Sequence, residues 1–421
     1  MKRTKLRGWI ALGLSFALLG GTSALGQETI RIGTLYPFTG PLAMLGTEEW
    51  RGAETARVVQ NEKGGVLGKK IEFVKADAPD AKAATSEAER LITVEKVKII
   101  TGSYSSSIAY ASTPVAEKYQ VIYFEQGGIA DNITQRGFKY LFRNNPLASD
   151  FGIRAIDLSE QTVCPKIGLK PANTKVAVIY EDSLYGTTVG TSAVKYGKER
   201  GFRIVADEPY SAKAVDLSSL IMKLKSAQPD ILIATSYVND AILISRQSKE
   251  LKFNVKEFIG CGGGHGTKDT ADALGDDINY IFNVDITQPR NTSEKFCPGI
   301  AEYSSRYQKI FGHPPRSGHS LRAYNGLLIA WDIIKKAGSL DAEALRQAAL
   351  SIDIPEGKTP TGWGVKFAPP GHPSMGTNLR AKPIVMQWFE QEQYAVWPAL
   401  AAVKDMVIPL PSWEERAKGK K

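Results

Sequence analysis

The strongest constraint on this chain is an alternation of strand-like and helix-like segments that runs through residues 29–124 and then begins again. A strand at 29–35 precedes a helix from about 47 to 61, which ends at Lys63-Gly64-Gly65. In the second series, residues 175–180 form an apolar run typical of a strand buried in a parallel sheet. Repeated βαβ units produce parallel sheets with helices on both faces. The sequence therefore predicts an α/β fold with two doubly wound, Rossmann-like lobes.

The remaining segments are expected to connect the two lobes or to complete their sheets. Residues 141–150 lie between the two series and are the expected first crossover. Residues 294–350 are mostly helical in pattern, and residues 355–380, rich in proline and glycine, are expected to form a long loop. A terminal hairpin is expected at 384–389 and 394–398. The other expected strands are 70–74, 97–100, 121–124, 202–206 and 230–235, with helices at 81–95, 105–118, 184–200, 216–226 and 239–251.

The first residues are typical of a secretory signal peptide. Lysines and arginines are concentrated in residues 2–7, an apolar run spans 9–19, and small residues lead to Gly26. The apolar run is shorter than the roughly 20 residues that span a bilayer, so a cleaved leader is favoured over a retained membrane anchor. No cysteine lies at the junction to carry a lipid. We therefore expect residues 1–26 to be removed and the mature chain to be a periplasmic protein.

Composition and charge are those of an ordinary globular protein. Charged residues make up 23% of the chain and hydrophobic residues 43%, and the length allows two domains. Part of the formal net charge of +9 leaves with the leader, and more lies in residues 411–421, which we expect to form a solvated basic tail. Because no basic segment is interleaved with aromatic residues, nucleic-acid binding is not expected. We expect a monomer.

The cysteines and histidines show no metal-binding or redox motif. An oxidising compartment would allow a disulfide between two of Cys164, Cys261 and Cys297, and the sequence decides neither whether it forms nor which pair it joins. None of them stands in a C-x-x-C unit. The four histidines, His319 among them, lack metal-ligand spacing, and structural roles are favoured for them. We expect neither a metal nor a cofactor.

Candidate ligand-binding residues follow the predicted strands, because ligands of open parallel sheets bind beyond the carboxyl ends of the strands. Tyr104, Ser105 and Ser106 lie in a Gly- and Ser-rich segment, 101–107, that opens a helix. Free N–H groups and hydroxyls at a helix N-terminus suit a carboxylate. A phosphate is less favoured because the segment lacks a P-loop lysine. Capping of the helix by these serines is an equally weighted alternative.

Glycines and tyrosines after other strands complete the predicted cleft. Gly127 and Gly128 follow the fourth strand, where adjacent glycines allow backbone carbonyls to approach a ligand closely. In the second lobe, Tyr185 and Tyr237 occupy matching positions after two strands and are expected to face the cleft. An aromatic ring with a polar edge is well suited to close over a small organic ligand.

Together these segments resemble the periplasmic branched-chain amino-acid binding proteins, the leucine-family receptors of ABC importers. The resemblance covers essentially the whole mature chain. It implies the type I periplasmic binding fold, in which two lobes joined by three hinge crossovers close over a ligand that is then presented to a membrane permease. The motifs that carry it are Ile32-Gly33-Thr34-Leu35, Thr39-Gly40-Pro41, Gly46, Gly52-Ala53, residues 61–65, Ser105-Ser106-Ser107, residues 114–118 and Tyr185-Gly186.

The resemblance also implies lobe boundaries and residue roles. Lobe 1 would hold residues 27–146 and 286–375, and lobe 2 residues 147–285 and 376–410. Ser105 corresponds to the serine that binds the ligand carboxylate. The implied roles of the others are a backbone contact near the ligand amine for Gly127, and second-lobe aromatic walls of the cleft for Tyr185 and Tyr237.

One departure from the family pattern bears on the ligand. Where relatives that bind α-amino acids carry an acid for the ammonium group, this chain has Gly262. A buried ammonium without a carboxylate is unfavourable. Either Glu125, Asp240 or Asp285 takes over, or the ligand lacks an amine. Leu45 replaces a tyrosine of the first lobe, so an aromatic or other organic acid, an amide or urea remains an alternative to a branched-chain amino acid.

Two other classes of function were weighed. An enzyme is not expected, because no G-x-G-x-x-G follows the first strand. Cys261 and His265 also lack a third group that would orient them as nucleophile and base. A ligand-sensing role, in which the closed form docks on a receptor, would use the same two lobes. Neighbouring permease and ATPase genes would indicate transport instead.

Overall fold

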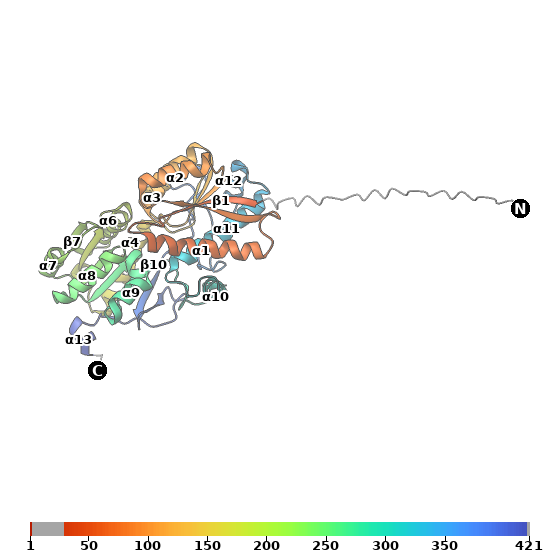
Figure 1. Cartoon of the computed structure of the whole chain (residues 1–421). Coiled ribbons are helices and arrows are strands. Elements are labelled where there is room, and N and C mark those ends of the chain that lie inside the picture. Colours follow the sequence, from red (N-terminus) through yellow and green to blue (C-terminus); the bar gives the residue numbers. More distant parts are fainter. Residues whose placement is uncertain (2–28, 419–421) are drawn as a thin grey trace.

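Short apolar runs form the strands of two separate sheets, one in each of two lobes that lie side by side (Figure 1). The structure is a computed structural model and describes Met1 and residues 29–418. The predicted leader, residues 1–26, therefore lies outside the described residues except for Met1. Among the residues that are described, no helix is both long and apolar enough to cross a membrane.

The first lobe contains a five-stranded parallel sheet in the order β2-β1-β3-β4-β5. Helices α1 and α11 pack on one face and α2 and α3 on the other, which confirms the doubly wound arrangement predicted for the first series. The elements are β1 (Thr29–Tyr36), α1 (Ala43–Glu62), β2 (Lys70–Asp77), α2 (Ala81–Thr93), β3 (Ile99–Gly102), α3 (Ser106–Lys118), β4 (Ile122–Glu125), β5 (Leu141–Arg143), α10 (Ile300–Phe311), α11 (Gly318–Ala337) and α12 (Ala342–Leu350).

The second lobe contains a seven-stranded sheet in the order β12-β11-β10-β9-β8-β6-β7. Its first five strands in the chain are parallel, and the predicted terminal hairpin joins them as the antiparallel pair β11–β12. The elements are α4 (Ala148–Leu158), β6 (Lys175–Glu181), α6 (Leu184–Glu199), β7 (Arg203–Tyr210), α7 (Ser218–Ala227), β8 (Ile231–Thr235), α8 (Val238–Glu250), β9 (Glu257–Cys261), α9 (Lys268–Leu274), β10 (Phe282–Asp285), β11 (Ile384–Phe389) and β12 (Glu392–Trp397).

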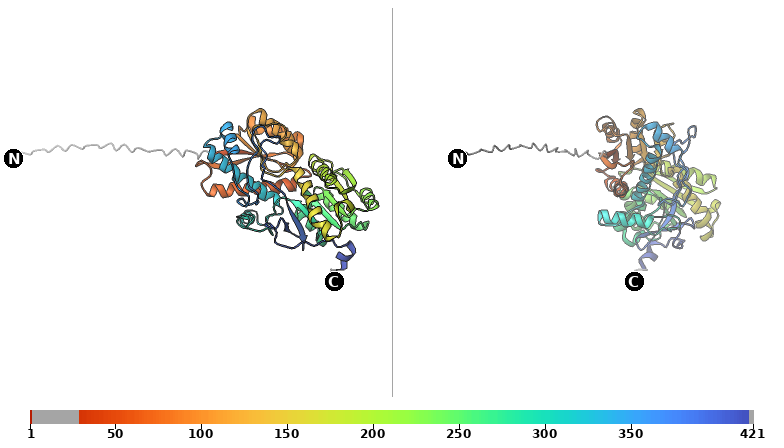
Figure 2. Two further views of the ribbon diagram at one scale, coloured as in Figure 1. Left: turned by 180° about the vertical axis from the view of Figure 1, so that it is seen from behind. Right: turned by 90° about the vertical axis from the view of Figure 1, so that its right-hand side faces the viewer.

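The chain passes between the lobes three times, after β5, after β10 and before β11, as the predicted fold requires. Two of these passes are held together by backbone hydrogen bonds: Arg143 N–H donates to the Gly376 carbonyl at 2.8 Å, and Asn378 N–H donates to the Arg143 carbonyl at 2.9 Å. Figure 2 shows the lobes from the opposite side, with the blue C-terminal segments beside the green second lobe. The lobe boundaries themselves stay a prediction.

Helices α1 and α11 form the core contact of the first lobe. Leu321, Leu327 and Trp331 of α11 are each at most 1% exposed. Gly52 on α1 permits the close approach, because a Cβ at this position would lie 1.8 Å from the Ser320 carbonyl oxygen. This packing fixes the first turns of α11, which reach the space between the lobes.

The C-terminal segment differs from the solvated tail predicted for residues 411–421. Helix α13 (Trp413–Lys418) packs on the second lobe, where Trp413 is 6% exposed and its indole N–H donates to the Phe253 carbonyl at 2.8 Å. The Arg416 guanidinium lies 3.7 Å from the centroid of the Trp413 ring. Docking of the indole therefore holds the start of this segment on the second lobe, while the side chains of Glu414 and Glu415 stay exposed.

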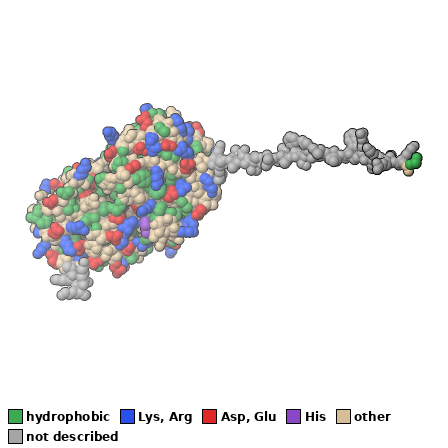
Figure 3. Space-filling model, viewed as in Figure 1, with side chains coloured by type: hydrophobic (Ala, Val, Ile, Leu, Met, Phe, Trp, Pro, Cys, Tyr) green, Lys and Arg blue, Asp and Glu red, His purple; other side chains and the backbone are tan. Residues whose placement is uncertain are grey.

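The surface carries charges of both signs. On the face shown in Figure 3, Lys and Arg side chains are interspersed with Asp and Glu side chains. Several of these cations pair with acids, for example Lys249 with Asp277 at 2.6 Å and Arg200 with Glu160 at 2.6 Å. The formal charge of +9 is therefore not gathered on this face into the basic patch that a nucleic-acid interface needs.

Candidate functional site

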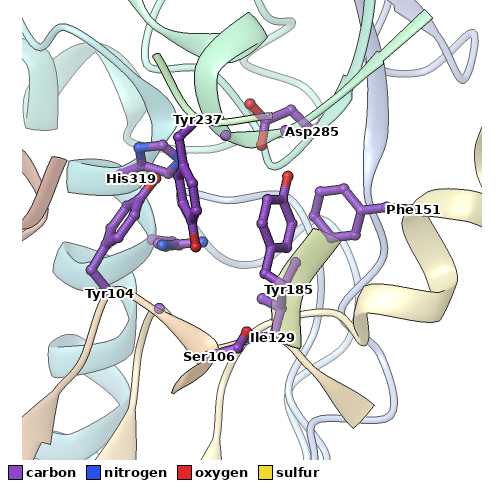
Figure 4. Close-up of a pocket in the computed structure, with 12 residues that line it drawn as sticks. Tyr104, Ser106, Ile129, Phe151, Tyr185, Tyr237, Asp285 and His319 are labelled. Atoms are coloured by element: carbon purple, nitrogen blue, oxygen red, sulfur yellow. The ribbon is translucent and has the colours of Figure 1, made fainter. Parts of the chain in front are cut away.

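The carboxyl ends of strands from both sheets surround a pocket between the lobes. First-lobe residues after β3 and β4 meet second-lobe residues at the ends of β6, β8, β9 and β10, and the start of α11 closes one side (Figure 4). The lining residues are Tyr104, Ser106, Gly127, Ile129, Phe151, Tyr185, Tyr237, Gly262, Gly263, Asp285, His319 and Arg322.

Two of the residues predicted for the site do not line this pocket. Gly128 packs behind the wall, where a Cβ would lie 2.5 Å from the Cβ of Ala109. Ser105 stands at the start of α3 and is 5% exposed. The other predicted residues are brought together around the pocket: Tyr104, Ser106, Gly127, Tyr185, Tyr237 and Gly262.

The start of α3 presents unused hydrogen-bond donors. Ser105 has an extended backbone conformation, and its side chain makes no capping bond to the helix, so the capping alternative is not realised there. The Ser106 hydroxyl oxygen accepts from the N–H groups of Ile129 and Ala130 at 3.2 and 3.1 Å, which leaves its proton to donate. Within the described residues, the N–H groups of residues 105–107 find no acceptor. These groups suit an anion.

The loop after β4 is organised by the buried carboxylate of Glu125. This carboxylate accepts from the N–H groups of Ser103, Gly127 and Gly128 at 2.8, 2.7 and 2.5 Å. Burial raises the pKa of Glu125, and the three N–H donors oppose the rise. A Cβ at Gly127 would lie 2.3 Å from the Ser103 carbonyl oxygen and 2.5 Å from the Cα of Tyr104. Glycine is therefore required for the two loops to lie this close together.

Two tyrosines form the aromatic wall of the second lobe. The rings of Tyr185 and Tyr237 lie 5.6 Å apart, and both point into the pocket (Figure 4). The Tyr185 hydroxyl donates to the Cys261 carbonyl. Burial raises the pKa of Tyr237, and hydrogen bonding with the Ser183 and Ser105 side chains offsets part of that rise. Tyr237 therefore reaches across the gap to the first lobe.

Helix α11 contributes two residues that the sequence prediction missed. The Arg322 guanidinium makes two hydrogen bonds to the Glu49 carboxylate, at 3.2 and 2.7 Å, and both side chains are at most 5% exposed. The ring of His319 lies 5.1 Å from that of Tyr104. Burial, and to a smaller extent the positive charge of Arg322, hold the pKa of His319 well below the usual range. The i, i+3 spacing of a histidine and an arginine at the start of a largely apolar helix was the available signal.

The three acids considered as replacements at the position of Gly262 occupy different places. Glu125 is held by backbone N–H groups, as described above. Asp240 accepts from the Tyr210 hydroxyl at 2.7 Å and does not line the pocket. Asp285 does line it, at the end of β10, and burial raises its pKa to about 6. Of the three candidates, Asp285 alone is positioned to meet a ligand.

The lobes also touch beside the pocket. Leu45 of α1 and Tyr104 pack with Val238 of α8 in one small apolar cluster that spans both lobes. Nearby, Arg316 at the entrance to α11 pairs with Asp269 and Asp272 of α9, each at 2.7 Å. The structure thus represents a closed arrangement of the lobes.

The alternative of an enzyme based on Cys261 and His265 gains no support from the geometry. The three cysteines are buried and unbridged, so the disulfide left open by the sequence does not form. His265 Nδ1 lies 2.9 Å from the Ser236 hydroxyl, not beside a nucleophilic thiol. Burial raises the pKa of Cys261 to about 12 and lowers that of His265 to about 4. In the described part of the chain, no cluster of metal-ligating side chains is present.

A known protein family and several curated relatives match nearly the whole chain. Residues 29–380 match the family described as periplasmic binding protein. The chain is 41% identical over 400 residues to the Leu/Ile/Val-binding protein homolog 7 of Brucella suis biovar 1 (strain 1330), covering 94% of this chain and 98% of the relative. The Leu/Ile/Val-binding protein homolog 8 of the same strain is 37% identical over 408 residues, covering 96% and 99%.

Solved structures share the fold at low sequence identity. The branched-chain amino acid transporter substrate binding protein LivJ from Streptococcus pneumoniae, in complex with isoleucine, has a TM-score of 0.74 at 23% identity, covering 88% of this chain and 100% of its own. A solute binding protein of an ABC transporter from R. palustris, in complex with benzoate, has a TM-score of 0.73 at 18% identity, covering 91% and 99%. The first of these proteins binds an amino acid and the second an aromatic acid without an amine.

Proposed function

Because the chain belongs to the periplasmic binding protein family, we propose that it captures a small organic carboxylate between its lobes and delivers it to an ABC permease at the inner membrane. Branched-chain amino acids are the first candidates, since the curated relatives are Leu/Ile/Val-binding protein homologues. The family and fold are those of binding proteins, and we expect no turnover of the bound compound. We further propose that residues 1–26 direct the chain to the periplasm and are then removed.

The observation that carries this proposal is the composition of the pocket walls. The first lobe offers uncommitted N–H groups at the start of α3 and the proton of the Ser106 hydroxyl. The second lobe offers the rings of Tyr185 and Tyr237. A carboxylate held by neutral donors at a helix N-terminus keeps its hydrogen bonds when water is excluded.

Closure of the lobes is the proposed mechanism of capture. The ligand first binds the first lobe through its carboxylate, and the second lobe then adds its aromatic wall. A ligand favours the closed form only through contacts that it makes with both lobes. The contact of Tyr237 with Ser105 and the apolar cluster around Leu45 add to the closed state.

A thermal-shift screen of the purified protein tests this function. The compounds are leucine, isoleucine, valine, phenylalanine, benzoate, 4-hydroxybenzoate and urea, each at several concentrations. A ligand that binds the folded state alone raises the melting temperature as its concentration rises. We expect such a rise for at least one carboxylate. If no carboxylate raises the melting temperature, the proposal is wrong.

A further inference from the structure

Asp285 lines the pocket and carries a buried carboxylate that pairs with no lysine, arginine or histidine among the described residues. Its hydrogen-bond donors are all neutral. We infer that Asp285 is the specificity residue that pairs with a cationic nitrogen of the ligand, so that the pocket takes a carboxylate that also bears an amine. This inference rests on the proposed function and names its ligand class.

The strand register places Asp285 beside Gly262. Val284 of β10 pairs with Cys261 of β9, so Asp285 and Gly262 are the next residues on neighbouring parallel strands. A Cβ built on Gly262 would lie 3.6 Å from Asp285 Oδ1 and 3.1 Å from the Tyr185 hydroxyl. The missing side chain of Gly262 therefore leaves space that Asp285 borders.

The backbone at Gly262 explains why an acid is not supplied from that position. Its φ of 65° and ψ of −149° lie in a region that L-residues with a side chain rarely adopt. Gly262 N–H donates to the Asn283 side-chain oxygen at 3.0 Å, which fixes this conformation. A carboxylate for the pocket is therefore provided by the adjacent strand.

The carboxylate of Asp285 is held in place but retains capacity to accept. Its Oδ1 accepts from Ile286 N–H at 2.7 Å, and its Oδ2 accepts from the side-chain amides of Asn283 and Gln288 at 2.9 and 3.3 Å. A carboxylate has about four acceptor positions, so Oδ1, on the side of Gly262, has one left. Burial of a carboxylate among neutral donors is unfavourable unless an opposite charge joins it.

The charge of Arg322 lowers the pKa of Asp285 in part, but among the described residues Arg322 makes no ion pair with this carboxylate. The Arg322 guanidinium is engaged through Nε and Nη2 with Glu49. Arg322 lines the pocket, and its Nη1 donates no hydrogen bond within the described residues. The pocket wall therefore carries a cation with one unused donor and an anion with an unused acceptor position. A zwitterion complements both signs.

The placement of the two charges within the pocket is visible in Figure 4. Asp285 lies at one end with the Tyr185 hydroxyl, and Ser106 lies at the opposite end. A ligand whose amine is separated from its carboxylate by several carbons, as in 4-aminobutanoate, could reach the start of α3 and Asp285 at once and so span the two lobes. Contacts with both lobes are what closure requires.

Titration calorimetry with matched ligand pairs tests this inference. Each pair differs only in the amine: L-leucine with 4-methylpentanoate, L-phenylalanine with 3-phenylpropanoate, and 4-aminobutanoate with butanoate. We expect the wild type to bind the amine-bearing member of at least one pair roughly 100-fold more tightly. In Asp285→Asn this preference should fall to within a few-fold, through weaker binding of the amine-bearing member. The control Asp240→Asn, a buried acid outside the pocket, should keep the wild-type preference.

The outcomes separate this inference from the proposed function. If the wild type binds both members of every pair equally well, or prefers the deaminated members, the inference is wrong while capture of a carboxylate stands. The same conclusion follows if Asp285→Asn keeps the preference. If none of the six compounds binds the wild type, the proposed function fails for these carboxylates, and the inference falls with it. The comparison of the two members of each ligand pair on the wild type tests the ligand class even where a variant does not fold.

Discussion

The two walls of the pocket hold their polar groups in different ways. In the first lobe, Glu125 is satisfied by backbone N–H groups of its own loops, and Arg322 is paired with an acid of the same lobe. In the second lobe, Tyr237 reaches Ser105 across the gap, and Asp285 keeps an unused acceptor position. The charges of the first wall are compensated within its lobe, although the N–H groups at the start of α3 stay free for a ligand, whereas the second wall keeps a carboxylate without an ion-pair partner among the described residues.

This difference indicates which lobe is preformed for the ligand. A wall whose charges are already compensated changes little when a ligand arrives, so it can act as the docking side. A wall that lacks a partner gains most when the ligand and the other lobe meet it, so its contacts favour the closed form. Substitutions in the first wall should therefore act mainly on folding, and substitutions in the second mainly on binding and closure.

The largest expected effect comes from breaking the ion pair of the first wall. In Arg322→Met, the carboxylate of Glu49 would remain buried without a cation. We expect the free energy of unfolding to fall by about 3–5 kcal/mol, measured by urea denaturation of the ligand-free protein. The double variant Arg322→Met with Glu49→Leu, which removes both charges, should regain most of that loss. A single variant as stable as the wild type would show that this wall is not held by the pair.

The pH dependence of stability should reveal the unpaired acid of the second wall. Burial raises the pKa of Asp285 to about 6, above its value in an unfolded chain. The folded state therefore binds the proton more tightly, and stability present at low pH is lost as pH rises from about 4 to 6, by up to about 3 kcal/mol. In Asp285→Asn, the decline measured by urea denaturation across this range should be shallower.

Other buried acids also contribute to the pH dependence of the free energy of unfolding. Burial raises the pKa values of Glu49 and Asp240 to about 7, so both groups extend the loss of stability to higher pH in wild type and variant alike. An unchanged decline below pH 6 in Asp285→Asn would contradict the assignment of a raised pKa to this carboxyl group.

A smaller effect is expected where the two walls meet. Replacing Ser105 with Ala should weaken carboxylate binding by about 1 kcal/mol, because Tyr237 loses its hydrogen-bond partner in the first lobe when the lobes close. Calorimetry with a carboxylate identified by the thermal-shift screen measures the change. Ser107→Ala is the matched control, since Ser107 lies in α3 two residues after Ser105 and makes no contact with Tyr237 among the described residues. Equal affinity in Ser105→Ala and wild type would remove Ser105 from the site.

The fold was predictable from the sequence because the strand and helix patterns of βαβ units depend on residues that are close together in the chain. Apolar strands such as 175–180 and helix stops such as Gly64-Gly65 depend on neighbours in the chain. The aromatic wall was also predictable, since Tyr185 and Tyr237 each directly follow a strand. The predicted roles of these residues in binding remain to be tested.

Arg322 and the docked C-terminus were not predictable in the same way. Arg322 lies more than 270 positions from its partner Glu49 in the chain, and only packing of α11 on α1 brings them together. Trp413 stands in a segment whose basic residues suggested solvation, and its binding surface near Phe253 is formed by the fold. The choice of Asp285 among three acids likewise needed the strand register between β9 and β10.

The smallest expected effects separate the two tyrosines of the second wall. In Tyr185→Phe, the Cys261 carbonyl loses its donor within the same lobe. The free energy of unfolding should fall by about 1 kcal/mol, with ligand affinity changed less than the stability. In Tyr237→Phe, the lost hydroxyl has a partner in each lobe, Ser183 and Ser105, so affinity should fall by about 1 kcal/mol together with a smaller fall in the free energy of unfolding. Urea denaturation measures the free energy of unfolding of each variant, and calorimetry measures its ligand affinity. If the two variants lose stability and affinity in the same proportion, the second wall does not divide into a structural and a closing tyrosine, because a hydroxyl bonded within one lobe should not respond to closure.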